Sequence, residues 1–276
     1  MELGTIPNHD SITLINGLNV PRTNVLQLGF DNIDGTTAIH RIEAFLQGSA
    51  NGDCRRVFFL NVHSIWLART DKLLAASISR ADLVLGDGSG LALATKLFGS
   101  PMVENLNGTD FVPRLIERAS VTGRSVFLLG GTPQISQICK KALLGLHPGL
   151  HIVGARSGYF SIDEESEICE EINRVKPDIL LVGMGAPLQE NWIDRNSSRL
   201  SARVCLGVGG LFDFLSGNRK RAPGWMRSLG IEFIYRFMSD PGGKWRRLMV
   251  ETPWFLAQVM LAVASRRIFH VPSTPK

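Results

Sequence analysis

Hydrophobic and polar positions follow two different periods along this chain. Short uninterrupted apolar runs, such as Val57–Leu60 and Ile179–Val182, are typical of strands that are buried on both faces of a parallel sheet. Between such runs, apolar residues recur at helical spacing, as they do over Thr36–Gln47 and Ile162–Val175. Strands that alternate with helices predict an α/β fold: a Rossmann-like, mostly parallel sheet with helices on both faces.

The same two patterns recur along most of the chain. Further strands are predicted at Leu83–Leu85, at Ser125–Leu129, around Ile152–Val153 and at Arg203–Val208. Further helices are predicted at Ile65–Ser79, Leu91–Leu97, Asp110–Ala119 and Gln134–Leu144, with another that starts near Glu190.

The last part of the chain differs in composition from the rest. From Arg219 to Arg267 there are ten basic residues and three acidic ones, whereas the net charge of the whole chain is only +5. We therefore predict a Rossmann-like domain over residues 1–217 and a basic, aromatic, helical appendage over residues 218–276. Such a surface suits nucleic acid, anionic lipid or a phosphorylated substrate. Its apolar run Trp254–Ala264 is too short to span a bilayer and suits an amphipathic helix in the membrane interface or, alternatively, a core helix.

Composition narrows the class of protein. A hydrophobic content of 44% and a charged content of 20% indicate a packed globular chain. The four cysteines are far apart and form no CxxC pair, which favours reduced thiols over a disulfide framework or a zinc site. The first ten residues lack an apolar signal-peptide core, and no run of about 18 uncharged apolar residues predicts a transmembrane helix. We expect the protein to stay in the cytoplasm.

Five loops that follow predicted strands carry the candidate chemistry. They are Asn61–Ser64, Gly86–Gly90, Gly130–Pro133, Gly183–Glu190 and Gly207–Phe214. Because the carboxyl ends of parallel strands meet at one edge of a sheet, these mostly glycine-rich loops would form a crevice lined with backbone amides, which suits a nucleotide diphosphate. The pattern is not the dinucleotide fingerprint, since no GxGxxG opens the first helix, and it is not a Walker loop, since no GK[ST] occurs.

Several segments resemble the WecG/TagA/CpsF glycosyltransferases (glycosyltransferase family 26). The resemblance runs from about Leu26 to Val250, and it is carried by GDGSG (Gly86–Gly90), NGTD (Asn107–Asp110), VFLLGGTP (Val126–Pro133), GYF (Gly158–Phe160), PDILLVGMGAPLQENW (Pro177–Trp192), GVGGLFDFLSGNRKRAP (Gly207–Pro223), Glu232 with Tyr235–Arg236, Pro241 and Trp245–Arg247. It implies inverting transfer of a sugar from a UDP-sugar to a polyprenyl-diphosphate-linked sugar, in exopolysaccharide or other cell-surface polysaccharide synthesis. It also implies a protein peripheral to the inner face of the cell membrane, with an appendage that completes the site there.

The resemblance assigns Asp87 as the catalytic base. A carboxylate at a loop tip can accept the proton of the acceptor hydroxyl, although an aspartate between glycines can also simply shape a tight turn. The appendage arginines are expected on diphosphate or lipid-phosphate oxygens, because a guanidinium can bind two oxygens at once; they are Arg219, Arg221, Arg227 and Arg236. No DxD-like pair is present, so these cations would stabilise the departing UDP, and neither a metal nor another cofactor is expected.

The same loops supply the residues expected to bind the donor or another part of the substrate. These residues are Asn61, His63, Gly130, Gly131, Gly183, Gly185, Gln189, Gly209 and Asp213. Asp213 alternatively caps a helix or pairs with an arginine, and His63 is alternatively a structural histidine.

The chain departs from the family pattern near the expected sugar pocket. Asn61–His63 stands where members often show Thr-x-Asn, Asn105 stands where an arginine is common, and Leu188 stands where a lysine is common. These departures favour UDP-glucose as the donor, with UDP-N-acetylmannosamine as the alternative. Outside the family, a basic protein that binds RNA or single-stranded DNA and a non-catalytic nucleotide-binding regulator are further alternatives. Within the family interpretation, no nucleic-acid partner is expected.

Overall fold

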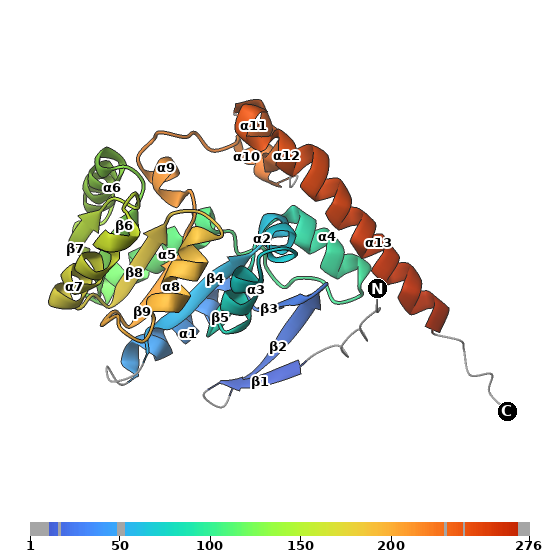
Figure 1. The fold of residues 1–276 in the computed structure, drawn as a ribbon, viewed down its shortest axis with the longest axis horizontal. Helices are drawn as coiled ribbons and strands as arrows, with labels where there is room; N and C mark the ends of the chain where they lie inside the picture. Colours follow the sequence, from blue (N-terminus) through green and yellow to red (C-terminus); the bar gives the residue numbers. More distant parts are fainter. Residues whose placement is uncertain (1–10, 16–17, 49–52, 229–230, 240, 270–276) are drawn as a thin grey trace.

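The computed structural model describes residues 11–15, 18–48, 53–228, 231–239 and 241–269. Within these residues, nine strands form one sheet in the order β1-β2-β3-β5-β4-β9-β8-β6-β7 (Figure 1). The strands are β1 (Ser11–Ile15), β2 (Leu18–Val25), β3 (Leu28–Asp31), β4 (Arg55–Leu60), β5 (Leu83–Gly86), β6 (Ser125–Gly130), β7 (His151–Arg156), β8 (Ile179–Gly183) and β9 (Val204–Gly207). From β3 onward neighbouring strands pair in parallel, which confirms the predicted mostly parallel α/β sheet.

The N-terminal edge of the sheet was not predicted. There β2 pairs antiparallel with both β1 and β3. Strand β2, LNVPRTNV, mixes polar residues with apolar ones and contains Pro21, which a sequence pattern cannot separate from a loop. Proline and polar residues are tolerated in such strands near a sheet edge because fewer ladder hydrogen bonds and less apolar contact are required there.

Helices cover both faces of the sheet. In the main body they are α1 (Gly35–Gln47), α2 (Val62–Ala68), α3 (Lys72–Ser79), α4 (Ser89–Leu97), α5 (Gly108–Val121), α6 (Pro133–Leu146), a 3₁₀ turn (Ile162–Glu164), α7 (Glu165–Val175), α8 (Leu188–Asn196) and α9 (Leu211–Leu215). In the appendage they are α10 (Gly224–Ser228), α11 (Glu232–Ser239), α12 (Pro241–Arg246), a π-helical turn (Arg247–Glu251) and α13 (Thr252–Phe269).

Alternate strand residues face two separate hydrophobic cores. On β4, Val57 and Phe59 join the core under α1, α5, α6 and α9, whereas Phe58 and Leu60 join the core under α3, α4, α7 and α8. This alternation follows from the period of two in a strand, and it explains why the apolar run is uninterrupted. Because helices cover both faces of the sheet, the positions where polar groups can meet a ligand are at the ends of the strands.

Two predictions about the main body are wrong. The predicted helix Ile65–Ser79 is two helices, because the Asp71 side chain accepts the Leu74 N–H at 2.9 Å and thereby caps a new helix, α3. Cys54 and Cys205 form a disulfide, whereas four free thiols were expected. They are 151 residues apart in sequence, but Cys54 directly precedes β4 and Cys205 lies on the neighbouring strand β9, a proximity that spacing along the chain does not reveal.

The appendage packs on the main body through its last helix. Helix α13 contacts α2 and α4, and its Phe255 and Val259 are fully buried in the core beneath them. The opposite side carries exposed Met260 and Leu261. Figure 1 shows α13 running along one side of the molecule, with α11 and α12 near its start. The core-helix alternative is confirmed for one face of α13, and the membrane-interface alternative stays a prediction for the exposed face.

Among the residues that the structure describes, one helical segment is long and apolar enough to cross a membrane by length and composition. It spans Arg247–Ser265, and 17% of it is buried. Apolar residues continue on the N-terminal side of Trp254–Ala264, but the segment also contains Arg247 and Glu251, so it is not an uncharged run and the expectation of no transmembrane helix stays a prediction. The contacts of α13 with α2 and α4 place part of this segment against the protein itself.

Candidate active site

A pocket of about 980 Å³ opens at the carboxyl ends of the parallel strands. Its wall is built from the loops that follow β4, β5, β6, β8 and β9, together with parts of the appendage. The strand order puts β4 beside β9, so the early and late parts of the parallel sheet meet there. Open α/β sheets bind ligands at such a place. The five loops identified from the sequence therefore converge on one pocket.

Asp87 is held in this wall by its neighbours. Its backbone N–H donates to the Leu60 carbonyl at 2.8 Å, and the next residue, Gly88, has a φ of +100° that favours glycine. The Asp87 carboxylate accepts a hydrogen bond from Asn61 Nδ2 at 3.3 Å. Asn61 is also the N-cap of α2. One asparagine thus fixes the start of α2 and orients the carboxylate proposed as the base.

Two long helices direct their N-termini at the pocket. Helix α5 is capped by Asn107 and α6 by Thr132, and in each case the cap side chain accepts a backbone N–H of the first turn. Both caps line the pocket. A helix N-terminus carries unsatisfied N–H groups and a partial positive charge, so it favours an anion such as a phosphate. The pocket wall is therefore suited to a diphosphate before any basic side chain is considered.

Gln189 holds two of the glycine loops together. Its Oε1 accepts the Gly185 N–H at 3.2 Å and the Gly209 N–H at 2.8 Å, and its Nε2 donates to Glu190 Oε1 at 2.8 Å. Gln189 is only 5% exposed. It lines the pocket as predicted, and its amide acts as a brace between the loops after β8 and β9.

Glu190 is the most deeply buried carboxyl group of the pocket wall. It is 3% exposed, and burial raises the pKa of its carboxyl, although the hydrogen bond from Gln189 opposes this shift. Its Oε2 makes no hydrogen bond within the described residues. Desolvation disfavours the charged form of a carboxyl, so Glu190 keeps its proton above the ordinary glutamate pKa.

The predicted glycines have different roles. Gly131, Gly185 and Gly209 line the pocket and have φ values of +63°, +80° and +55°, where other residues are strained. Gly183 also lines the pocket. Gly130 is not among the lining residues, within the part of the chain that is described. A Cβ on Gly130 would lie 2.5 Å from the Gly183 carbonyl oxygen, so this glycine serves strand and helix packing and its predicted role in donor binding is not supported.

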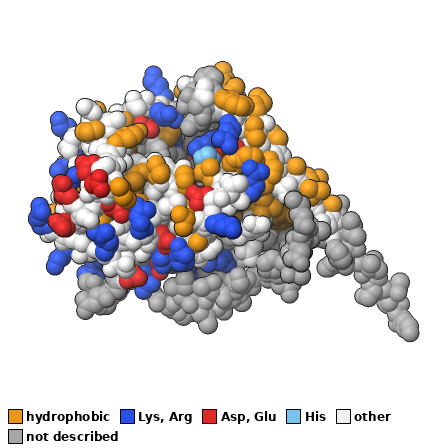
Figure 2. Space-filling model, in the orientation of Figure 1, with side chains coloured by type: hydrophobic (Ala, Val, Ile, Leu, Met, Phe, Trp, Pro, Cys, Tyr) orange, Lys and Arg blue, Asp and Glu red, His pale blue; other side chains and the backbone are white. Residues whose placement is uncertain are grey.

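The basic residues divide into two groups. Arg219, Lys220, Arg247 and His63 line the pocket, and Figure 2 shows Lys and Arg side chains beside a histidine near the centre of this face. Arg221 instead donates to Asp110 Oδ1 at 2.6 Å on α5, and it is absent from the pocket lining of the described chain. It was predicted to bind phosphate, but the structure shows it fastening the appendage to α5.

The remaining predicted residues are resolved only in part. Arg227 and Arg236 lie on α10 and α11, but their side chains are outside the described part of the structure. Asp213 lines the pocket, accepts a hydrogen bond from Asn218 Nδ2 at 3.0 Å and lies 3.9 Å from Arg219 Nε. These contacts agree with the alternative interpretation, in which Asp213 pairs with an arginine.

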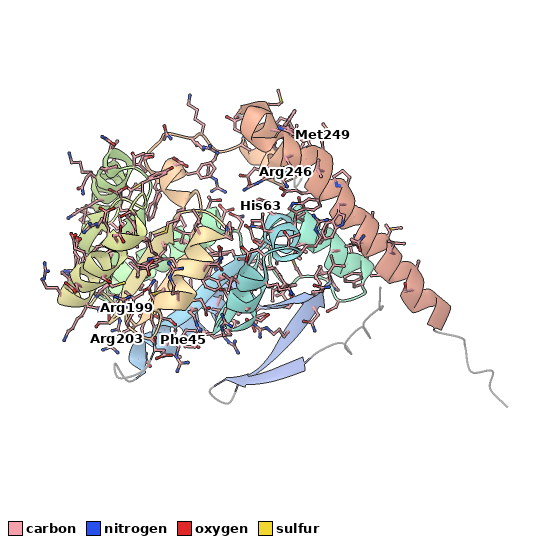
Figure 3. The ribbon with its side chains drawn as sticks, in the orientation of Figure 1. Phe45, His63, Arg199, Arg203, Arg246 and Met249 are labelled. Carbon is pink, nitrogen blue, oxygen red and sulfur yellow. A yellow bond between two sulfur atoms is a disulfide. The ribbon has the colours of Figure 1, made fainter. Side chains whose placement is uncertain are left out.

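Arg247 and Glu251 are among the site residues that the sequence analysis missed. Arg247 belongs to the Trp-Arg-Arg segment that supported the family resemblance, yet only the fold brings it to the pocket. Glu251 is 3% exposed and lies 2.7 Å from His63 Nδ1, through its Oε2. Figure 3 shows His63 on the side of α2 that faces the appendage. A contact that spans 188 residues leaves no signal in a local pattern.

The described residues contain no group of three or more His, Cys, Asp or Glu side chains placed to hold a metal ion. The positive charge that the pocket offers comes from Arg219, Lys220, Arg247 and the N-termini of α5 and α6.

Comparison with known proteins decides the class. Residues 23–268 match the family described as "Glycosyl transferase WecG/TagA/CpsF family". The chain belongs to this family. Relatives in the WecG/TagA/CpsF family include proteins of Staphylococcus aureus strains MRSA252 and MW2, each 30% identical over 254 residues that cover 91% of this chain and 96% of the relative. Both are named N-acetylglucosaminyldiphosphoundecaprenol N-acetyl-beta-D-mannosaminyltransferase.

Membership of the WecG/TagA/CpsF family confirms the glycosyltransferase class that the sequence motifs implied. The match runs from β2 into α13, so it includes both the pocket loops and the appendage. The nucleic-acid-binding and regulator alternatives gain no support from it. The relatives are named for transfer of N-acetylmannosamine, whereas the departures near the sugar pocket had led us to prefer glucose as the donor for this chain.

Proposed function

We propose that this protein transfers N-acetyl-D-mannosamine from UDP-N-acetylmannosamine to N-acetylglucosaminyl-diphospho-undecaprenol, with inversion at the anomeric carbon. The observation that carries the proposal is the similarity to relatives of that name over 91% of the chain, together with a pocket that combines Asp87 with diphosphate-binding features. UDP-glucose, the donor first expected, becomes the alternative.

The proposed reaction is a single displacement. The acceptor hydroxyl oxygen attacks the anomeric carbon, the bond from that carbon to the UDP oxygen breaks, and Asp87 takes the hydroxyl proton. The relatives are named for a β-mannosaminyl product, which corresponds to inversion when the sugar is α-linked to UDP. Asn61 holds the Asp87 carboxylate by one oxygen, so it orients the base relative to the acceptor.

Charge on the departing UDP is stabilised without a metal in this proposal. The N-termini of α5 and α6 offer N–H groups, and Arg219, Lys220 and Arg247 offer positive side chains around the same pocket. Donors fixed in place before the reaction stabilise developing charge without reorganisation. The glycine loops allow the backbone to come close to the diphosphate.

We further propose that the protein works at the inner face of the cell membrane. An undecaprenyl chain is held in the bilayer, so the pocket has to approach the surface. The appendage beside the pocket carries exposed apolar side chains, among them Ile234, Met238, Trp245, Met260 and Leu261. Apolar groups and nearby cations both increase binding to anionic lipid.

The test is transfer by the purified protein from individual UDP-sugars to a lipid-diphosphate-linked N-acetylglucosamine. The proposal predicts that kcat/KM for UDP-N-acetylmannosamine exceeds that for UDP-glucose at least tenfold. A clear preference for UDP-glucose would restore the alternative donor. No transfer from any UDP-sugar would refute the proposed reaction.

A further inference from the structure

The π-helical turn Arg247–Glu251 places two side chains toward the main body. It connects α12 to α13. Its first residue, Arg247, lines the pocket, and its last residue, Glu251, is 3% exposed and lies 2.7 Å from His63 Nδ1 through its Oε2. Short π-helical turns occur often at functional sites. Arg247 and Glu251 are the two ends of one five-residue turn, so a contact that fixes one also restricts the other.

His63 connects this turn to the catalytic loop. It lies in the first turn of α2 and itself lines the pocket. The N-cap of that helix, Asn61, donates to the Asp87 carboxylate at 3.3 Å. The path from the appendage to the proposed base therefore runs from Glu251 through His63 and the start of α2 to Asp87.

A second contact fastens the same two elements. Trp66, one turn further along α2, makes an edge-to-face contact with Trp254 of α13, with ring centroids 5.1 Å apart. The Arg69 guanidinium lies 4.0 Å from the centroid of the Trp66 ring and 5.3 Å from that of Trp254. The buried Phe255 and Val259, together with this aromatic contact, already dock α13 on the main body, so docking does not require the buried carboxylate of Glu251.

The chemistry of the pair supplies a reason for that carboxylate. A carboxylate without access to water is costly unless a donor satisfies it, and His63 Nδ1 is such a donor in the protonated ring and in the Nδ1–H tautomer of the neutral ring. Donation from Nδ1 fixes the orientation of the ring and, when the ring is neutral, the tautomer. A carboxylate that holds an imidazole in this way determines which ring nitrogen is presented to a substrate, as in hydrolase triads.

We propose that Glu251 is a positioning residue for this site, acting through His63 on the catalytic loop and through the π-helical turn on Arg247. The appendage then sets the geometry of the pocket, in addition to its role at the membrane. The activity part of this inference rests on the proposed function. The structural part, the link between Glu251 and α2, does not.

Hydrogen exchange of the free protein tests the link without any substrate. Glu251→Ala removes the acceptor for His63, and we expect exchange of the α2 backbone amides to rise at least tenfold. The matched control is Met249→Ala in the same turn, because Met249 is 59% exposed; this control should leave α2 exchange as in the wild type. Equal α2 protection in Glu251→Ala and in the control would overturn the link, whatever the enzyme transfers.

Steady-state kinetics then test the positioning role, at a temperature well below the unfolding transition of each variant. We expect Glu251→Ala to lower kcat about 10-fold to 100-fold and to change KM for the UDP-sugar less than threefold. Glu251→Gln, whose amide oxygen can still accept from Nδ1, should stay within about threefold of the wild-type kcat. His63→Ala and the double variant should match Glu251→Ala, because residues that act as one unit are not additive.

The outcomes separate the two proposals. A wild-type protein that transfers no sugar refutes the proposed function, and the exchange measurement still decides the link. A wild-type protein that transfers sugar, with kcat unchanged in folded Glu251→Ala, overturns the positioning role. Loss of kcat in Glu251→Gln as severe as in Glu251→Ala would also overturn it, because the hydrogen bond would then not be the relevant feature.

Discussion

Replacing Asp87 with asparagine separates proton transfer from binding. Asparagine has nearly the same shape, and its carbonyl oxygen can still accept from Asn61 Nδ2, as the Asp87 carboxylate does at 3.3 Å. The bond from the residue 87 backbone N–H to the Leu60 carbonyl is unaffected. The fold and the UDP site should therefore survive, while the group that accepts the hydroxyl proton is lost.

The expected loss of kcat follows from the proposed role of Asp87 as the general base. A positioned general base typically contributes a factor of about 10² to 10⁴ in rate. We therefore expect Asp87→Asn to lower kcat about 100-fold or more, which corresponds to at least about 2.7 kcal/mol of transition-state stabilisation. UDP affinity, measured by calorimetry, should stay within about threefold of the wild type.

The matched comparison is Asp213→Asn, in the same pocket. Asp213 is held by Asn218 and lies near Arg219, so its loss should affect binding and loop order more than proton transfer. Near-normal turnover in Asp87→Asn would refute the assignment of the base. An equal loss of kcat in both variants would show that negative charge in the pocket matters, and not a base at this position.

Transfer should persist in excess EDTA, because helix N-termini and basic side chains surround the diphosphate site; full loss that manganese or magnesium restores would contradict this. Burial raises the pKa of the Glu190 carboxyl above its usual value of 4.5. The folded state therefore binds this proton more tightly than the unfolded state does. The resulting contribution to the free energy of unfolding is complete below pH 4.5 and is lost as the pH rises through the raised pKa. The Tm of Glu190→Gln should therefore fall less than that of the wild type between about pH 5 and pH 8, and identical pH dependence would show that Glu190 is not protonated in the folded state. Replacing the exposed Met260 and Leu261 with serine should weaken sedimentation with anionic liposomes and leave transfer to a soluble short-chain acceptor intact, whereas undiminished sedimentation would exclude this face as the membrane contact.

Point substitutions test the membrane contact of α13 better than a truncation does, because α13 also fills part of the core. Truncation after Glu251 would also remove Phe255 and Val259, which are fully buried in the core of the main body. Such a loss would expose apolar surface on α2 and α4 and would confuse membrane binding with stability.

Local sequence patterns predicted the central sheet because its strands are buried on both faces. The runs around Val57–Leu60 and Ile179–Val182 are uninterrupted for that reason. Strand β2 was missed because Pro21 and its polar neighbours do not form such a run. The break between α2 and α3 was missed because the cap Asp71 lies within an otherwise continuous helical pattern.

At the candidate site, too, local patterns could be predicted and long-range contacts could not. Asp87 and the glycine loops could be found because parallel strands bring their carboxyl ends to one edge, so position along the chain predicts position in space. Gly130 was assigned to the donor because a pattern does not distinguish a glycine that approaches a ligand from one that approaches another strand. Glu251 could not be found, since its partner His63 is 188 residues away and only the docking of α13 brings them together.

The most direct test of the central claim is the product itself. The purified protein would be given N-acetylglucosaminyl-diphospho-undecaprenol, or a shorter-chain analogue, with equal amounts of UDP-N-acetylmannosamine and UDP-glucose, and the lipid product would be examined by mass spectrometry and NMR. The account predicts addition of one N-acetylhexosamine in β linkage. Addition of a hexose would contradict the proposed donor, an α linkage would contradict inversion, and an unchanged acceptor would contradict the proposed transfer.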